Sequence, residues 1–110
     1  MQPGEVEFHC SVFELKRRID EGEEVFLLDV REVVEAETAN LGGKLIPLGE
    51  LPARLRELDP RQEIIVYCHH GVRSVAAANY LRANGLGRAR NLAGGIDRWS
   101  LDVDSSVRRY

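Results

Sequence analysis

The sequence predicts an α/β fold built on a parallel sheet, and three observations support this prediction. Short apolar runs alternate with segments whose apolar residues recur every three or four positions. Two of the runs, residues 25–28 and 64–67, are apolar throughout, as expected for strands that are covered on both faces. Strands that alternate with helices connect by right-handed crossovers, so we expect the strands of the sheet to run parallel.

Length and charge narrow the class of protein. The chain has 110 residues, of which 44% are hydrophobic and 30% charged. This suits one domain over residues 1–110, with a core at about residues 5–100 and a C-terminal tail at 101–110. The net charge of −3 offers no bulk electrostatic reason to bind nucleic acid.

Two further features bear on the compartment. No apolar run approaches the ~20 residues that span a bilayer, and the first residues lack a signal-peptide layout. We therefore expect a cytoplasmic protein without a membrane partner. In that compartment its two cysteines are expected to be free thiols.

The first half of the chain is expected to alternate strands and helices. Ser11 and Glu14 form a capping-box pattern at the start of the first helix, and Gly22 is a natural stop. Four leucines at helical spacing predict the last helix of this half, with Pro52 tolerated in its first turn. The expected elements are strands at residues 6–8, 25–28 and 44–46 and helices at residues 11–22, 32–39 and 48–58.

The second half holds the strand that we expect to be central. The expected elements are strands at residues 64–67 and 89–92 and helices at residues 74–84 and 96–100. Gly85 ends the first of these helices, and Trp99 is expected to anchor the second in the core. The polar residues after Trp99 lack helical periodicity, so we expect this tail to lie extended on the domain or to fray.

Cys68 ends the strand at 64–67 and opens a loop that leads directly into an alanine-rich helix. The amides of such a loop and the positive end of the helix both favour an anion, and Arg73 adds a fixed cation. Since the thiolate is the nucleophilic form of cysteine, this setting predicts a reactive Cys68. A buried structural cysteine is the alternative, but it would not need Gly71 or Arg73.

Four segments, in order, resemble the signatures of the rhodanese family, the sulfurtransferases that carry sulfur as a cysteine persulfide. These segments are residues 27–32, 42–48, 68–74 and 91–99. The resemblance extends from about residue 6 to residue 99, which is nearly the whole chain. It implies a five-stranded parallel sheet with helices on both faces, and an active-site loop between the fourth strand and the following helix.

The resemblance also implies a reaction. Cys68 would attack the outer sulfur of a small anionic donor such as thiosulfate and become a persulfide. Cyanide, a thiol or an acceptor protein would then take the sulfur, in ping-pong fashion and without a cofactor. The loop residues expected to bind the substrate are His69, His70, Gly71, Val72, Arg73 and Ser74. Arg73 either attracts the anionic donor or braces the loop, and the sequence leaves both roles open.

The spacing between Cys68 and Arg73 argues against phosphate chemistry. Related phosphatases of the same fold carry one more residue in this loop, because a phosphoryl group is wider than a sulfur atom. A phosphatase or an arsenate reductase is therefore the weaker enzyme alternative. A non-catalytic rhodanese-like binding module is the alternative from another class, but such modules usually lose the cysteine that this chain keeps.

His69 and His70 permit two interpretations. Adjacent histidines make a poor chelating pair, so we expect no metal. They either shape the rim of the pocket, where partial protonation would attract an anion, or are solvated loop residues.

Other polar residues are expected to play supporting roles. Asp29 ends a buried strand and is expected to accept hydrogen bonds from nearby loop amides or from an arginine. Arg31 is expected to form a local salt-bridged surface with its acidic neighbours, among them Glu35. Cys10 is expected to be a bystander thiol. The tail lacks two prolines found in related tails, with Ser105 and Arg108 in their place, so we expect it to be loose.

Overall fold

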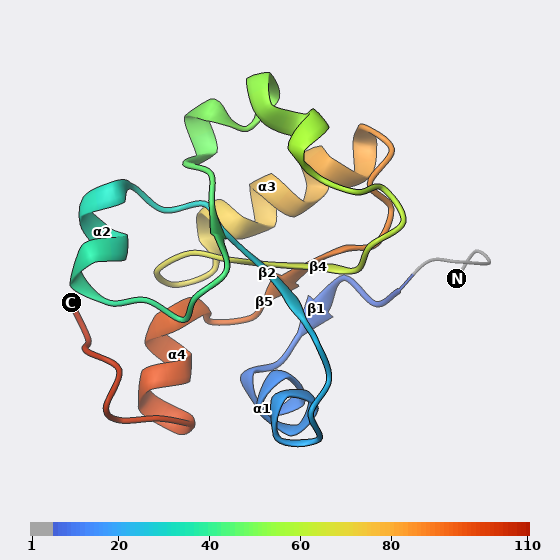
Figure 1. Ribbon diagram of the computed structural model, residues 1–110. Helices are drawn as coiled ribbons and strands as arrows, with labels where there is room; N and C mark the ends of the chain where they lie inside the picture. The colour runs from blue at the N-terminus through green and yellow to red at the C-terminus, as the bar shows by residue number, and fades with distance from the viewer. Residues whose placement is uncertain (1–5) are drawn as a thin grey trace.

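The computed structural model describes residues 6–110 and confirms the α/β fold class (Figure 1). Five parallel strands form one sheet in the order β1-β5-β4-β2-β3, so β4 is central. The strands are β1 (His9–Cys10), β2 (Phe26–Asp29), β3 (Lys44–Leu45), β4 (Ile64–Tyr67) and β5 (Ala89–Leu92). The helices are α1 (Val12–Asp20), α2 (Val33–Thr38), α3 (Val72–Ala83) and α4 (Gly95–Asp102), with 3-10 helices η1 (Leu48–Glu50) and η2 (Pro52–Glu57).

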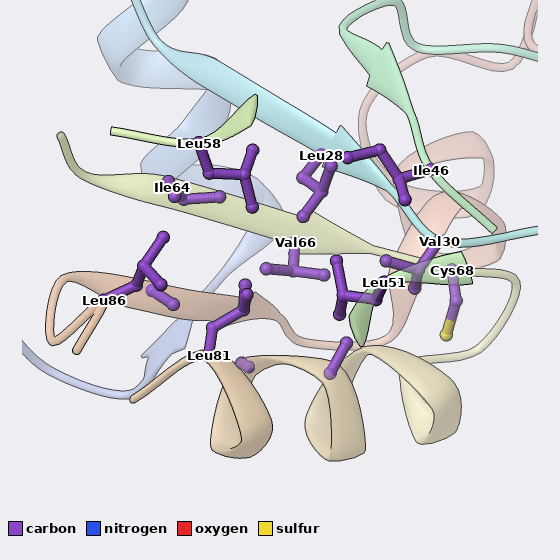
Figure 2. Packing of buried hydrophobic residues seen from close by; sticks show 13 residues of the cluster. Leu28, Val30, Ile46, Leu51, Leu58, Ile64, Val66, Cys68, Leu81 and Leu86 are labelled. Carbon is purple, nitrogen blue, oxygen red and sulfur yellow. The ribbon is translucent and has the colours of Figure 1, made fainter. Parts of the chain in front are cut away.

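Helices cover both faces of the sheet, as expected. Side chains along a strand point alternately to the two faces, and β4 therefore contributes to two separate cores. Ile64 and Val66 pack with α3 and with the leucines of the η1–η2 region, as Figure 2 shows. Ile65 and Tyr67 pack on the other face with α1 and α4. Cys68 continues the alternation and lies on the α3 face (Figure 2).

The boundaries of the elements agree closely with the sequence pattern, apart from a few shifts. The strands at 64–67 and 89–92 begin and end where we expected them, whereas the first strand lies at His9–Cys10 instead of residues 6–8. Ser11 caps α1, since its hydroxyl accepts a hydrogen bond from the Glu14 amide at 3.0 Å. The Glu14 carboxylate binds Arg90 rather than completing the capping box.

The α-helix expected at residues 48–58 is wrong, because two 3-10 helices occupy this segment. The amides of Leu51, Arg54 and Leu58 each bond to the carbonyl three residues earlier. Pro52 stands at the start of η2, where its missing amide hydrogen is tolerated as expected. The spacing of the leucines still indicates which side chains pack inward, because Leu51 and Leu58 are buried in the core.

The expectation of a loose tail is also wrong. The residues 101 and 102 belong to α4, and the amides of Val103 and Asp104 bond to the Trp99 carbonyl at 2.9 and 3.0 Å. Val107 then packs against the α1–α4 core, and its carbonyl accepts the Ser100 hydroxyl at 2.5 Å. These contacts hold the tail without prolines. Figure 1 shows the chain end beside α2. Within residues 6–110, no helix is long and apolar enough to cross a membrane.

Candidate active site

Cys68 lies at the carboxyl end of the central strand, where open α/β sheets bind their ligands. Its side chain is fully buried. The sulfur atom accepts hydrogen bonds from the Gly71 amide at 3.1 Å and the Ser74 amide at 3.3 Å, and the Ser74 hydroxyl lies 3.3 Å away. Both amides are at the N-terminus of α3, whose dipole favours negative charge there. The loop therefore surrounds the sulfur with groups that stabilise an anion.

Gly71 makes this convergence of amides possible. Its φ of +100° places it in the left-handed region, which favours glycine. A Cβ atom at this position would lie 3.2 Å from the Gly94 nitrogen. Gly71 thus lets the chain turn sharply from the strand into α3 while its amide points at the sulfur.

The first turn of α4 fixes the other side of the loop. The Ile96 amide donates to the Cys68 carbonyl and the Asp97 amide to the His69 carbonyl, both at 3.0 Å. Gly95 permits this approach, because a Cβ there would lie 2.5 Å from each of these carbonyl oxygens. The Gly94-Gly95 pair is therefore a turn that seats α4 against the loop.

Arg73 is held by a carboxylate from another helix. Its two terminal nitrogens bind the two oxygens of Glu35 on α2, at 2.7 and 2.8 Å. This forked hydrogen bonding from Arg73 lowers the pKa of Glu35 to about 2, so the carboxylate stays ionised. Of the two roles left open for Arg73, this contact corresponds to bracing the loop.

Asp29 and Arg31 form a buried ion pair that is linked to the Arg73–Glu35 pair. Arg31 donates to the Asp29 carboxylate from Nε at 2.9 Å and from Nη2 at 2.7 Å. Arg31 is fully buried, so the salt-bridged surface expected around it is wrong. Its Nη1 reaches the Tyr110 hydroxyl at 3.0 Å, and that hydroxyl donates to Glu35 at 2.9 Å. A continuous network therefore joins the end of β2 to the loop.

The tail also covers part of the rim. The Tyr110 ring stacks on the His69 ring at a centroid distance of 3.9 Å, and the His70 ring stacks on the His69 ring at 3.8 Å. Burial, together with the neighbouring His70, lowers the pKa of His69. This shift opposes the expected partial protonation at His69. Its Nε2 is buried and has no hydrogen-bond partner among residues 6–110.

Asp97 joins the two histidines at the rim. One potential ligand atom from each of His69, His70 and Asp97 lies within 4.8 Å of the others. The Asp97 carboxylate is already bound by Arg109 at 2.9 Å, and this ion pair lowers its pKa. Within the described residues, the carboxylate of this group is thus engaged by the tail.

Cys10 has different surroundings. It is fully buried, but it packs in the α1–α4 core, on the opposite face of the sheet from Cys68. Its thiol donates to the Ser11 carbonyl at 3.5 Å. Burial, followed by the nearby Glu14 carboxylate, raises the pKa of Cys10 to about 11. The two thiols are therefore not placed to resolve one another.

Several residues that shape the site were missed by sequence reasoning. Glu35, Tyr110 and Asp97 come from α2, the tail and α4, and their spacing from Cys68 carries no local signal. Asn91 is different, because a side-chain amide in the buried strand β5 needs hydrogen-bond partners. Its Oδ1 accepts a hydrogen bond from the Ser74 hydroxyl at 2.5 Å, and that hydroxyl is itself next to the Cys68 sulfur.

Comparison with known proteins identifies the family of the chain. A family model described as "Rhodanese-like domain" matches residues 11–102. The "Putative sulfur carrier protein YrkF" of Bacillus subtilis is 37% identical over 91 residues, which are 82% of this chain and 49% of that protein. This chain therefore spans about half the length of that relative. A protein named "Sulfurtransferase" from Allochromatium vinosum is 34% identical over 87 residues, or 78% of this chain and 81% of its own.

Solved structures show the same architecture. A rhodanese-like domain protein from Staphylococcus aureus superposes with a TM-score of 0.81 at 30% identity, covering 94% of this chain and 99% of that one. The human single-domain sulfurtransferase TSTD1 superposes with a TM-score of 0.76 at 26% identity, covering 88% of this chain and 98% of that one.

Proposed function

Because the chain belongs to the rhodanese-like domain family, we propose that it is a sulfurtransferase in which Cys68 carries sulfur as a persulfide. The observation that carries the proposal is the pair of amides, from Gly71 and Ser74, that point at the Cys68 sulfur. Relatives of the chain bear the names sulfurtransferase and sulfur carrier protein, which supports the same class of reaction.

The first half of the proposed reaction loads the cysteine. The Cys68 thiolate attacks the outer sulfur of a small anionic donor such as thiosulfate. A sulfur–sulfur bond forms at Cys68, the sulfur–sulfur bond of thiosulfate breaks, and sulfite leaves with the bonding electron pair. The loop amides and the positive end of α3 stabilise the negative charge before and after this step.

The second half unloads the sulfur. A nucleophile attacks the outer sulfur of the persulfide, and Cys68 leaves again as a thiolate. Cyanide serves in the test tube, and a thiol, such as one on an acceptor protein, serves in a cytoplasmic setting. A relative named as a putative sulfur carrier protein supports a protein as a partner in sulfur transfer.

The competing functions fit the site less well. A phosphatase or arsenate reductase would use the loop arginine on its substrate, whereas both terminal nitrogens of Arg73 are bound to Glu35. A non-catalytic binding module would not need two amides aimed at a cysteine sulfur. Both features favour sulfur transfer.

Thiocyanate formation from thiosulfate and cyanide tests the proposal. Cys68→Ser should lower the rate by about a thousandfold or more, because the nucleophile is lost. Cys10→Ser is the matched control and should retain activity. Mass spectrometry of the thiosulfate-treated protein should find one added sulfur on Cys68. Equal activity in wild type and Cys68→Ser would refute the proposal, and efficient Cys68-dependent release of phosphate from an aryl phosphate would favour the phosphatase instead.

A further inference from the structure

A line of hydrogen bonds runs from the Cys68 sulfur across the sheet to the surface. The sulfur lies 3.3 Å from the Ser74 hydroxyl, which donates to Asn91 Oδ1 at 2.5 Å. Asn91 Nδ2 in turn lies 3.2 Å from His9 Nδ1 on the edge strand β1. Ser74 and Asn91 are buried, with exposed fractions of 0% and 2%, whereas His9 is exposed. Two buried polar groups thus connect the reactive sulfur with a surface imidazole.

The direction of these bonds matches a protonated Cys68. A serine hydroxyl has one hydrogen, and Ser74 gives it to Asn91, so its oxygen faces the sulfur as an acceptor. The Cys68 thiol can then donate to Ser74. At the far end, the Asn91 amide nitrogen has hydrogens to give, so His9 Nδ1 accepts one. This places His9 in its neutral form with the ring hydrogen on Nε2.

The same directions do not suit a thiolate. Once the thiol proton has left, the sulfur and the Ser74 oxygen face each other as two acceptors. The Ser74 hydroxyl satisfies the thiolate by rotating to donate to it, and this rotation leaves Asn91 Oδ1 without that donor. A buried acceptor without a partner is costly. The cost disappears when the Asn91 amide turns over, so that Nδ2 faces Ser74 and Oδ1 faces His9.

A turned Asn91 places a requirement on His9. Its Oδ1 is an acceptor, so His9 Nδ1 must then carry a hydrogen. A neutral His9 meets this by releasing the hydrogen of Nε2 to water and taking one on Nδ1, and a protonated His9 carries both. The proton from Cys68 leaves to solvent, so one proton is released overall when His9 only changes tautomer.

We propose that Ser74, Asn91 and His9 form a reversible hydrogen-bond relay that sets whether Ser74 accepts from, or donates to, the Cys68 sulfur. The relay rests on the proposed role of Cys68 as the nucleophile, and its members are positioning residues. In one orientation it stabilises the thiol. In the other it adds a third hydrogen-bond donor to the amides of Gly71 and Ser74.

Charged groups at both ends are already paired. At the surface end, Arg90 donates to the His9 carbonyl at 2.9 Å and binds Glu14 of α1 and Glu63. Phe8 contacts the His9 ring edge to face, with centroids 4.9 Å apart. At the sulfur end, Arg73 is paired with Glu35. The relay therefore links two sites whose formal charges are each compensated locally.

The test measures the rate at which iodoacetamide alkylates Cys68 as a function of pH, read at each cysteine by mass spectrometry. His9→Asp presents only acceptor oxygens to Asn91, so it satisfies the amide in its present orientation and leaves the turned Oδ1 without a donor. It should lower the Cys68 rate near neutral pH by about tenfold, which is what leaving one buried polar group unsatisfied costs. His9→Asn is the rescue variant, because its amide presents either a donor or an acceptor. It should restore most of the rate.

The second arm asks whether His9 acts through Ser74. In a Ser74→Ala background, His9→Asp should change the Cys68 rate by less than about twofold, since coupled residues are non-additive. An equal effect in both backgrounds, or no effect of His9→Asp in the wild type, would overturn the relay. Cys10 reports on the fold within each sample, because loosening would speed alkylation of both thiols. Alkylation needs no sulfur donor, so failure of the relay is distinct from failure of the thiocyanate assay.

Discussion

Cys10 and Cys68 hold similar positions relative to the neighbouring elements, yet their surroundings differ. Each is fully buried, each lies at the carboxyl end of a parallel strand, and each is followed by a helix. At Cys10, α1 starts two residues later. The Ser11 hydroxyl accepts a hydrogen bond from the Glu14 amide in the first turn of that helix. At Cys68 three loop residues intervene before α3, and the amides of Gly71 and Ser74 point at the sulfur.

The comparison separates burial from reactivity. Burial alone disfavours a thiolate, as the raised pKa of Cys10 illustrates. At Cys68 the same degree of burial is combined with hydrogen-bond donors, which favour the anion. The length of the loop and the glycine within it, not the depth of the residue, therefore distinguish the candidate nucleophile from the bystander.

Gly71→Ala should break the comparison most strongly. Alanine at a φ of +100° is strained, and its Cβ would press on the Gly94 nitrogen, so the amide would turn away from the sulfur. Losing a hydrogen bond to a charged group should lower the sulfur-transfer rate by about tenfold to a hundredfold. Gly22→Ala is the control, because Gly22 also has a positive φ but lies in open space after α1. If both variants keep full activity, the amide of Gly71 is not needed.

Glu35→Gln should have a smaller effect, by freeing Arg73 and loosening the loop. We expect sulfur transfer to fall by about fivefold and the free energy of unfolding by about 2 kcal/mol, as for hydrogen bonds to a charged group. Because folding lowers the pKa of Glu35 to about 2, the carboxylate stabilises the protein above its ordinary pKa of 4.5. The difference in stability should disappear as pH falls from 4.5 toward 2.

Denaturant titrations at several pH values would measure this, with Glu57→Gln as the matched control. Folding also lowers the pKa of Glu57 to about 2, but its partners Arg54 and Lys44 lie in the η1–η2 region and β3, outside the active-site loop. The control should leave sulfur transfer unchanged. A loss of activity in Glu57→Gln as large as in Glu35→Gln would mean that the brace has no specific role.

Tyr110→Phe should have the smallest effect. Phenylalanine keeps the stack on His69 but loses the hydrogen bonds to Glu35 and Arg31. We expect about a twofold loss in kcat/KM and a fall in Tm of a few degrees, since a partly exposed hydrogen bond contributes about 1 kcal/mol. Steady-state kinetics and thermal melts would check this. A loss that exceeds that of Glu35→Gln would show that the tail matters more than the brace.

Short-range patterns predicted the α/β class, the parallel sheet and the position of Cys68 at a strand end, and the family resemblance supplied the five strands. The strand at 64–67, the loop from Cys68 to Ser74 and the capping by Ser11 all depend on residues close in sequence. The contacts that complete the site do not. Glu35 reaches Arg73 across 38 positions, and Tyr110 reaches Glu35 across 75. Such pairs follow from how α2 and the tail pack, which no local periodicity encodes.

The two elements that were predicted wrongly illustrate the same limit. Leucine spacing in residues 48–58 reported which side chains are buried, but the backbone there formed 3-10 turns. The tail lacked the prolines that would stiffen it, but hydrogen bonds from Ser100 and Tyr110 hold it in place. In both segments, tertiary contacts decided the conformation.

The central claim is that the loop amides, not burial, make Cys68 the reactive thiol. Alkylation rates of both cysteines in the wild-type protein, measured between about pH 5 and pH 10 and resolved by mass spectrometry, test it most directly. We predict that Cys68 reacts much faster than Cys10 at neutral pH, because Cys10, with a pKa of about 11, stays unreactive until the alkaline end of this range. If Cys10 reacts as fast as Cys68 at neutral pH, or faster, the amide arrangement does not explain the site.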